Sequence, residues 1–378
     1  MDSGRADILI VGGGLAGCAA AYFLAREGAD VLLIEQHDLN ALASGSNSGS
    51  LHAQIPYEPF VAGGDSFAKA FQPVVPLMLQ SIALWKALER ELSADFEVST
   101  SGGLLVADSE QQMIAVRAKV KFEQEAGLPI EVVSKAELLA IAPYLSEKIA
   151  GGSYCTAEGK ANPLQAGPAL AQAAERHGAR ILRNTRLTHL VAEAEGFTAK
   201  TTAGTIFAAR VLNCGGADAG RIGRMVGLDL EIEGFPIQVN ITEAVEPLVK
   251  HLVYSAGDRL TLKQTRHGGV VIGGGWPARI NPDTGRPEVE PASIPPNLRA
   301  AINLVPALEG VQLLRTWPAI VNGTRDWRPI LGEAPRVPGF FTCIFPWMGF
   351  TAGPMSARLV ADQMMGRKPP QSFAQFFL

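Results

Sequence analysis

The chain has 378 residues, of which 47% are hydrophobic and 19% charged, and its formal net charge is −4. This length can form two domains with sizeable cores, and the mixed charge, without a basic block, argues against a nucleic-acid partner. The cysteines are single and widely spaced, at Cys18, Cys155, Cys214 and Cys343. We therefore expect neither a disulfide framework nor a metal site, and a reducing, cytoplasmic setting.

The first pattern along the chain is a strand followed by glycines. Ile8 to Val11 are apolar and mostly β-branched, which is typical of a buried parallel strand. Gly12, Gly14 and Gly17 follow as G-x-G-x-x-G and open a helix. The three glycines permit a tight turn, a close approach to a pyrophosphate and close packing of helix on strand. Because a helix N-terminus also presents free N–H groups to an anion, the pattern predicts a dinucleotide site.

An acidic residue completes this unit. Val31 to Ile34 form a second buried strand that ends at Glu35, the position where an acid binds ribose hydroxyls. The apolar run from Ile8 to Ala25 has the composition of a secretory or membrane-spanning segment. It lacks a basic flank and contains the nucleotide glycines, so we expect no targeting or transmembrane segment there.

Residues 43–52 are small and polar, with the sequence ASGSNSGSLH. Composition alone is compatible with a flexible loop. Alternatively, the hydroxyl and backbone N–H groups wrap a phosphate or an extended cofactor. The position of the segment, just beyond a nucleotide-binding unit, favours a ligand.

Helical and extended patterns then alternate. Apolar spacing predicts one or two helices over 67–92, a strand over 101–107, and helices over 110–126 and 134–141. Further along, it predicts a helix over 163–178 and strands at 180–182, 187–191 and 208–213, with a hairpin turned at Ala203-Gly204. Gly215 and Gly216 come between the last of these strands and a helix over 219–226. They are either a second phosphate-side turn or an ordinary junction.

The remaining chain is antiparallel in character until its end. Strands are predicted at 239–242, 259–263 and 270–273, a surface excursion at 281–296 and a helix over 298–308. The segments 317–332 and 340–345 lead to Gly349-Phe350-Thr351-Ala352-Gly353-Pro354, which opens a last helix over 355–365. Glycine and proline at a helix start suit close approach to a ligand.

These parts, in this order, resemble the D-amino-acid oxidase family of flavoproteins, a group that includes glycine oxidase and sarcosine oxidase. The likeness rests on the Gly-rich turn with Glu35, the small-residue loop, Asn162-Pro163 at a helix start, Asn213 to Gly216, and the terminal G-F-x-x-x-P helix. It spans nearly the whole chain. Within the group, residues 44–52 look most like the catalytic β subunits of opine oxidases and related cyanide-forming or hydroxyproline dehydrogenases.

The resemblance implies an α/β fold in which a Rossmann-type FAD-binding domain carries an inserted α+β substrate domain with an antiparallel sheet. We expect the FAD-binding domain to be discontinuous, over 1–95, 150–226 and 312–378, and the substrate-binding domain to cover 96–149 and 227–311. The family implies non-covalent FAD and oxidation of the C–N bond of an amino acid or secondary amine by hydride transfer to the flavin. Water then hydrolyses the imine.

The residues expected to bind FAD come from the glycine turns, the small-residue loop and the start of the last helix. They are Gly12, Gly14, Leu15, Ala16, Gly17, Glu35, Gln36, Ser44, Gly45, Ser46, Asn47, Ser48, Gly49, Ser50, Leu51, Gly215, Gly216, Gly349, Phe350 and Thr351.

The substrate side departs from the family pattern. The family commonly carries a carboxylate-binding arginine in a W-x-x-x-R-P stretch, where this chain has Val321. A carboxylate in a dry site needs a cationic partner. The candidates, each of which can equally be an ordinary exposed charge, are Lys263, Arg266, Arg325 and Arg328.

His52 titrates near neutral pH and lies just past the flavin loop, so it either hydrogen-bonds the cofactor or substrate or packs as a loop histidine. We therefore expect His52, Lys263 and Arg325 as catalytic residues. Tyr57, Tyr254 and Trp276 are candidate pocket residues, with core packing as the alternative.

The resemblance also implies an assembly, in which a larger flavoprotein subunit and a small iron–sulfur subunit accompany the catalytic chain. The scattered cysteines cannot ligate a cluster unaided, so any cluster, and any FMN, belongs to a partner. Phe345 to Met348 and Ser372 to Leu378 suit a subunit interface, or else a pocket wall and intramolecular packing. Two other functions remain open: a self-contained oxidase that produces hydrogen peroxide, and a non-catalytic electron-relay subunit.

Overall fold

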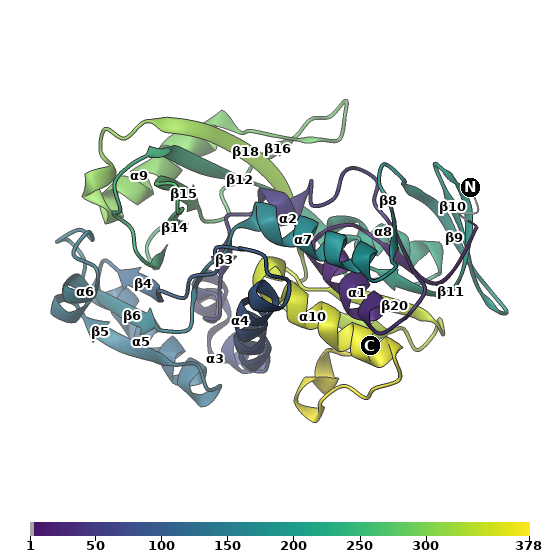
Figure 1. Cartoon of the computed structure of the whole chain (residues 1–378). Coiled ribbons are helices and arrows are strands. Elements are labelled where there is room, and N and C mark those ends of the chain that lie inside the picture. The colour runs from purple at the N-terminus through teal and green to yellow at the C-terminus, as the bar shows by residue number, and fades with distance from the viewer. Residues whose placement is uncertain (1–3) are drawn as a thin grey trace.

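The computed structural model describes residues 4–378, which form two large sheets with helices between and around them (Figure 1). The first sheet has the order β19-β20-β11-β1-β2-β8, and β10 and β9 extend it from β11. Its strands are β1 (Arg5–Val11), β2 (Val31–Ile34), β8 (Arg180–Leu182), β9 (Leu187–Glu193), β10 (Gly196–Thr201), β11 (Gly204–Asn213), β19 (Ile330–Glu333) and β20 (Phe340–Ile344). The central strands β20, β11, β1, β2 and β8 pair in parallel.

Strand β1 is buried on both of its faces, as its unbroken apolar run predicts. Ile8 and Ile10 belong to the core beneath α1 (Leu15–Arg26), whereas Leu9 and Val11 join the opposite core, which includes Ile222 of α8 (Ala219–Met225). The first sheet is therefore covered on both sides, and its ligand-binding edge is left at the strand ends.

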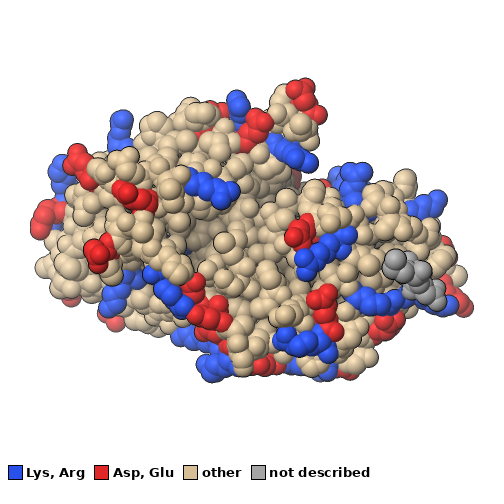
Figure 2. Space-filling model, turned by 45° about the horizontal axis from the view of Figure 1, so that its top comes forward, with Lys and Arg blue, Asp and Glu red and all other residues tan. Residues whose placement is uncertain are grey.

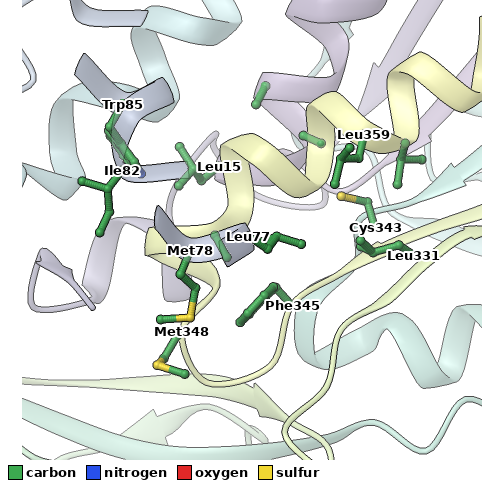
Figure 3. Packing of buried hydrophobic residues seen from close by; sticks show 14 of the residues in the cluster. Leu15, Leu77, Met78, Ile82, Trp85, Leu331, Cys343, Phe345, Met348 and Leu359 are labelled. Carbon is green, nitrogen blue, oxygen red and sulfur yellow. The ribbon is translucent and has the colours of Figure 1, made fainter. Parts of the chain in front are cut away.

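Helix α10 (Gly349–Met364) ties the first sheet to the helical middle of the molecule. It contacts α1, α4 (Val74–Glu91) and β20, and α1 also contacts α7 (Pro163–Arg176). Figure 3 shows buried side chains from α4 and from the first sheet gathered around α10. They are Leu77, Met78, Ile82 and Trp85 from α4 and Leu331 and Cys343 from the sheet.

The second sheet has the order β18-β12-β15-β14-β13-β4-β6-β5 and is antiparallel except where β13 pairs with β4. Its strands are β4 (Gly103–Ala107), β5 (Ile130–Ser134), β6 (Gly151–Cys155), β12 (Glu233–Ala244), β13 (Leu252–Ser255), β14 (Thr261–Gln264), β15 (Gly269–Gly273) and β18 (Leu313–Gly323). Helices α5 (Glu110–Glu125), α6 (Lys135–Ile141) and α9 (Ile294–Leu304) pack around it. The remaining elements are the helix α3 (Tyr57–Phe71) and the short α2 (Ala43–Ser46), β3 (Ser50–Leu51), β7 (Gly159–Lys160), η1 (Gly216–Asp218), β16 (Arg279–Ile280), β17 (Pro287–Glu288), η2 (Pro291–Ser293), η3 (Pro306–Leu308) and η4 (Gln371–Phe376).

Sheet membership differs from the expected domain division at two strands. Both β6 and β18 fall in segments expected to belong to the FAD-binding domain, yet both pair in the second sheet. Strand β18 pairs with β12 from Gly323 opposite Glu233 to Leu313 opposite Thr242. Because of this long antiparallel pairing, the chain leaves the second sheet and enters the first only after Gly323, rather than at residue 312.

Helix starts also differ from the predictions, for local reasons. Helix α10 begins at Gly349, and Pro354 lies inside it, past the first turn, where it removes one intrahelical bond. Helix α9 likewise starts at Ile294, with Pro295 and Pro296 in its first turn. Among residues 4–378, no single helix is long and apolar enough to cross a membrane, and α3 and α4, which together pass that test, are bent by 70°.

The C-terminal aromatic segment packs on its own chain. Phe373 and Phe376 are 1% and 3% exposed, and the backbone N–H of Leu378 donates to the carbonyl of Leu331 at 2.9 Å. Phe373 and Phe376 thus follow the alternative of intramolecular packing, and the interpretation of the segment as a subunit interface stays a prediction. These two rings complete the core beside β19.

Candidate active site

The parallel strands of the first sheet end at one edge, and the glycine turn lies there. Gly12 has a φ of +113°, and a Cβ on it would lie 2.4 Å from the carbonyl oxygen of Cys214, just after β11. A Cβ on Gly17 would lie 1.9 Å from the carbonyl oxygen of Gly12. Both positions therefore require glycine. The turns after β1 and β11 pack backbone against backbone at the edge where open α/β sheets bind ligands.

The N-terminus of α1 is left open to an anion. Its cap residue, Gly14, has no side-chain cap, and no acidic residue lies in the first turn, which holds Leu15, Ala16 and Gly17. The N–H of Leu15 donates to Ser44 Oγ at 2.9 Å, and a Cβ on Gly14 would lie 2.9 Å from the same oxygen. This cradle, which a side chain would fill, fits a pyrophosphate.

Glu35 is held in place at the end of β2. Its Oε2 accepts the N–H of Gly13 at 2.7 Å and its Oε1 accepts that of His37 at 2.8 Å. A carboxylate has about four acceptor positions, so two remain for ribose hydroxyls. Gln36, beside it, is half-buried. The arrangement fits the adenosine end of a dinucleotide.

Residues 43–51 are ordered by a hydrogen bond within the segment and by contacts with two strands elsewhere in the chain. Trp317 of β18 donates its indole N–H to the carbonyl of Ser46 at 2.8 Å, and Asn47 Oδ1 accepts the N–H of Gly49 at 2.7 Å. Strand β3 pairs with β7, which buries Leu51 completely. The segment therefore forms α2 and β3 rather than a flexible loop, and Leu51 is a core residue.

A hydrogen-bonded junction joins β3 to the N-terminus of α10. Thr351 Oγ1 accepts the N–H of His52 at 2.8 Å and lies 3.2 Å from the carbonyl oxygen of Ser50. Ser81 and Trp85 of α4 donate to the carbonyl of Thr351 at 2.6 and 3.0 Å. Because α10 also lacks a side-chain cap and first-turn acids, it presents a second open helix end, formed by Gly349, Phe350 and Thr351.

Gly215 and Gly216 have a local explanation. A Cβ on Gly215 would lie 2.5 Å from Cδ1 of Ile222, and Gly216 has a φ of +56°. Asn213 accepts the N–H of Gly215 at 3.1 Å and donates to the carbonyl of Ala219 at 2.9 Å. These contacts are those of a tight junction between β11 and α8, so a phosphate-side role here stays a prediction.

A cavity of about 700 Å³ opens between the two sheets. One wall is built from the segment 43–50 with Phe350 and Thr351, and the others come mainly from β12, β13 and the loops beside them. The face seen in Figure 2 is hollowed near its centre, where uncharged residues predominate, and charges of both signs are scattered around it. The cavity thus adjoins the residues expected to hold FAD.

Three aromatic rings form one wall of this cavity. The centroid of the Trp347 ring lies 4.5 Å from that of Phe235 and 4.9 Å from that of Trp327, and all three residues line the cavity. Trp327 and Trp347 have φ values of +62° and +59°, which is strained backbone for bulky residues. A Cβ on Gly323 would lie 2.5 Å from the Trp347 ring. Within the segment Phe345 to Met348, Trp347 and Met348 line the cavity, which agrees with one of the two interpretations of this segment from the sequence.

Comparison with known proteins identifies the family. The pattern described as FAD dependent oxidoreductase (DAO) matches residues 7–363. The chain belongs to this family. It is 29% identical to a glycine oxidase of Geobacillus kaustophilus (strain HTA426), over 99% of this chain and 97% of that one. The crystal structure of glycine oxidase from Geobacillus kaustophilus matches it with a TM-score of 0.87 at 28% identity, covering 99% of this chain and 98% of that chain.

A second relative is an opine oxidase subunit of Rhizobium meliloti, 29% identical over 98% of this chain and 96% of that one. The expected family, fold class, FAD cofactor and enzyme class are confirmed: the chain is an FAD-dependent amine or amino-acid oxidoreductase. The glycine cradle, Glu35 and the two open helix ends fit FAD on physical grounds. The individual FAD contacts stay predictions.

The predicted substrate residues of this FAD-dependent oxidoreductase fall in different places. His52 lines the cavity, and its Nδ1 lies 2.6 Å from the hydroxyl of Tyr254, another lining residue. Burial and the nearby Lys263 lower the pKa of His52 to about 3, so the ring is neutral. Lys263 is 2% exposed and donates to Ser50 Oγ at 2.7 Å. Burial lowers the pKa of Lys263 to about 7.

Neither Lys263 nor the other predicted cations line the cavity. Arg266 pairs with Asp95 on the surface, Arg328 donates to the carbonyl of Gln375 at 3.2 Å, and Arg325 is exposed. Val321, in place of the family's arginine, does line the cavity, as does Tyr57, whereas Trp276 does not.

Arg259 is a cavity-lining cation that the sequence did not reveal. It lines the cavity, and its guanidinium lies 3.5 Å from the carboxylate of Glu58, with side chains 54% and 61% exposed. No sequence motif marks Arg259. The place of its side chain depends on how β13 and β14 pair around it.

Proposed function

We propose that this enzyme oxidises the C–N bond of a secondary-amine amino acid, such as an opine, an N-methyl amino acid or a hydroxyproline. The observation that carries the proposal is the cavity. Its volume of about 700 Å³ is shared by the substrate and the flavin ring, because residues expected to hold FAD form one of its walls. The aromatic wall of Phe235, Trp327 and Trp347 suits an N-alkyl substituent. The similarity to an opine oxidase subunit supports this substrate class.

The chain's own residues orient the cofactor and substrate and exclude water from the reaction site. Bound FAD supplies the two-electron acceptor for the hydride. The segment 43–50 and the first turn of α10 would hold it against the cavity. The aromatic rings exclude water from the reacting carbon, and neutral His52 places no positive charge beside the amine.

Arg259 is our proposed partner of the substrate carboxylate, and its removal gives the first prediction. We expect Arg259→Met to raise KM about 10- to 100-fold with little change in kcat, because a hydrogen bond to a charged group contributes about 1.5–3 kcal/mol. Arg266→Met, which removes a surface charge paired with Asp95, is the matched control. Steady-state kinetics measure both. Equal KM values for wild type and Arg259→Met would assign carboxylate binding elsewhere.

The reaction itself is tested by anaerobic bleaching of the flavin. We expect N-alkyl amino acids to bleach it, and faster than their primary-amine counterparts, because the aromatic wall contacts the N-substituent. Glycine, which fills little of the cavity, is the control ligand. A flavin that responds to no amine would indicate an electron-relay subunit, and the proposal would fail.

We also propose that the chain is the catalytic subunit of a heteromeric dehydrogenase that passes electrons to a partner with an iron–sulfur centre or FMN. Two of its relatives are named as subunits, one of opine oxidase and one, the beta subunit, of sarcosine oxidase, which supports this. Turnover of the amine that bleaches the flavin, now measured in the presence of oxygen, distinguishes a heteromeric dehydrogenase from a self-contained oxidase. Stoichiometric hydrogen peroxide from the chain alone would favour a self-contained oxidase, whereas turnover with an artificial acceptor that rises on co-expression with genomic neighbours supports the heteromer.

A further inference from the structure

Glu158, in the turn between β6 and β7, is a fully buried carboxylate that touches the cavity lining. It accepts the backbone N–H groups of Ala53 and Gln54 at 2.5 and 2.9 Å and the side-chain amide of Gln54 at 2.7 Å. The hydroxyl of Tyr254 donates to it at 3.2 Å. A Cβ on Gly103 would lie 1.8 Å from its Oε2. The surrounding chain therefore leaves a space shaped for this carboxylate.

The charges around Glu158 do not balance. Lys119 and Glu123 of α5 are also fully buried. Lys119 donates to Glu123 and, at 3.2 Å, to Gln54 Oε1. One ammonium thus serves two carboxylates, and an unneutralised charge is costly in a protein interior. Acceptance of one proton by this cluster (Lys119, Glu123 and Glu158) makes it neutral.

A chain of hydrogen bonds leads from the cavity to this cluster. His52 Nδ1 lies 2.6 Å from the Tyr254 hydroxyl, which lies 3.2 Å from Glu158 Oε1. An ionised carboxylate only accepts, so the single hydroxyl proton of Tyr254 points to Glu158, and the hydroxyl oxygen accepts Nδ1–H of His52. The other ring nitrogen, Nε2, then carries a lone pair, and it bonds to no residue among 4–378.

We infer that His52, Tyr254 and Glu158 form a proton relay that removes the proton from the substrate ammonium before its C–N bond is oxidised. The inference rests on the proposed function, because alkylammonium groups have pKa values of about 10 and only the neutral amine can release a hydride. The ammonium N–H bond breaks as His52 Nε2–H forms. Nδ1–H passes to Tyr254, and the Tyr254 proton passes to Glu158, whose carboxylate becomes a carboxylic acid.

The environment of each member suits transfer towards Glu158. Burial lowers the pKa of His52, so the ring passes the proton on, and it raises the pKa of the Tyr254 hydroxyl and of Glu158. The titratable groups that face these three come from four elements. They are Lys119 and Glu123 of α5, Cys155 of β6, Lys263 of β14, and Tyr254 itself on β13.

The test removes the middle of the relay. At pH 7 we expect Tyr254→Phe and Glu158→Gln to lower kcat/KM for the best bleaching amine about 100-fold or more. The loss should shrink towards pH 10, where free amine is present in solution. Tyr144→Phe is the matched control, because Tyr144 pairs with His251 Nδ1 at 2.9 Å and neither lines the cavity. Its profile should follow that of wild type.

Infrared difference spectra provide a readout other than turnover. Anaerobic mixing of wild type with the same amine should produce a carboxylic-acid carbonyl band that is absent in Glu158→Gln. The relay alone is overturned if the wild type reacts with amines and Tyr254→Phe shows the same pH profile and the same carbonyl band as the wild type. A wild type whose flavin reacts with no amine overturns the proposed function and the relay together.

Discussion

The Gly14→Val variant is expected to purify without FAD and to bind added FAD more than about 100-fold more weakly than wild type, a loss of about 2.7 kcal/mol. A Cβ at this position would lie 2.9 Å from Ser44 Oγ, which is the acceptor of the Leu15 N–H. The two methyl groups of valine would extend from that Cβ into the open N-terminus of α1, where the pyrophosphate must approach the backbone.

Binding is measured by flavin absorbance after gel filtration and by the rise in thermal midpoint on adding FAD, which a non-binding variant lacks. Gly4→Val is the matched control, because a Cβ on Gly4 meets no atom within 4 Å. It should retain FAD. If Gly14→Val kept its flavin at wild-type affinity, the pyrophosphate would have to lie elsewhere.

The cofactor side of the site could be predicted from sequence because its signals are local. Gly12 and Gly17 are required by contacts with the adjoining turns, and Glu35 follows its strand directly. The constraints on Gly17 and Glu35 act within the first strand–turn–helix–strand unit, so the residue pattern records them. Gly12 in addition meets the carbonyl of Cys214, which follows β11 much later in the chain. The short segment 43–51 was less clear, since its order depends on Trp317, which lies far along the chain.

The division between the two sheets depends on contacts that the sequence does not record. Strand β18 has no alternating pattern that would assign it to one sheet, and only its register with β12 places it in the second. The same limit applies to Arg259. The pairing of β13 with β14 brings Arg259 to the cavity. Because the sequence does not reveal this pairing, four other cations were equally plausible as the carboxylate partner.

Buried charge is a second class of feature that sequence reasoning missed. The helix over 110–126 was predicted, and α5 covers Glu110–Glu125. Its apolar residues Met113, Val116 and Val120 face the core, and Lys119 and Glu123 share that face. Charged residues in a helix are normally solvated. Their burial became apparent only with the cluster that surrounds Glu158.

Lys119→Met is expected to destabilise the FAD-saturated enzyme by about 3–5 kcal/mol at pH 8, because it leaves two fully buried carboxylates without their cation. The Lys119→Met/Glu123→Gln double variant should lose less, since it removes one of those charges. Burial already raises the pKa of Glu123, while Lys119 lowers it, so loss of the lysine raises it further. A carboxyl with a raised pKa favours folding at low pH and loses that contribution as pH rises through its folded pKa.

The deficit of Lys119→Met should therefore shrink as pH falls from 8 to 5. Urea unfolding midpoints across this range measure it, and Arg117→Met is the control on the same helix. Arg117 pairs with Glu110, but the two side chains are 44% and 72% exposed, and exposed pairs contribute about 0–1 kcal/mol. A pH-independent deficit would mean that Glu123 and Glu158 do not take up the missing charge as protons, and that the lysine acts through packing of its aliphatic stem instead.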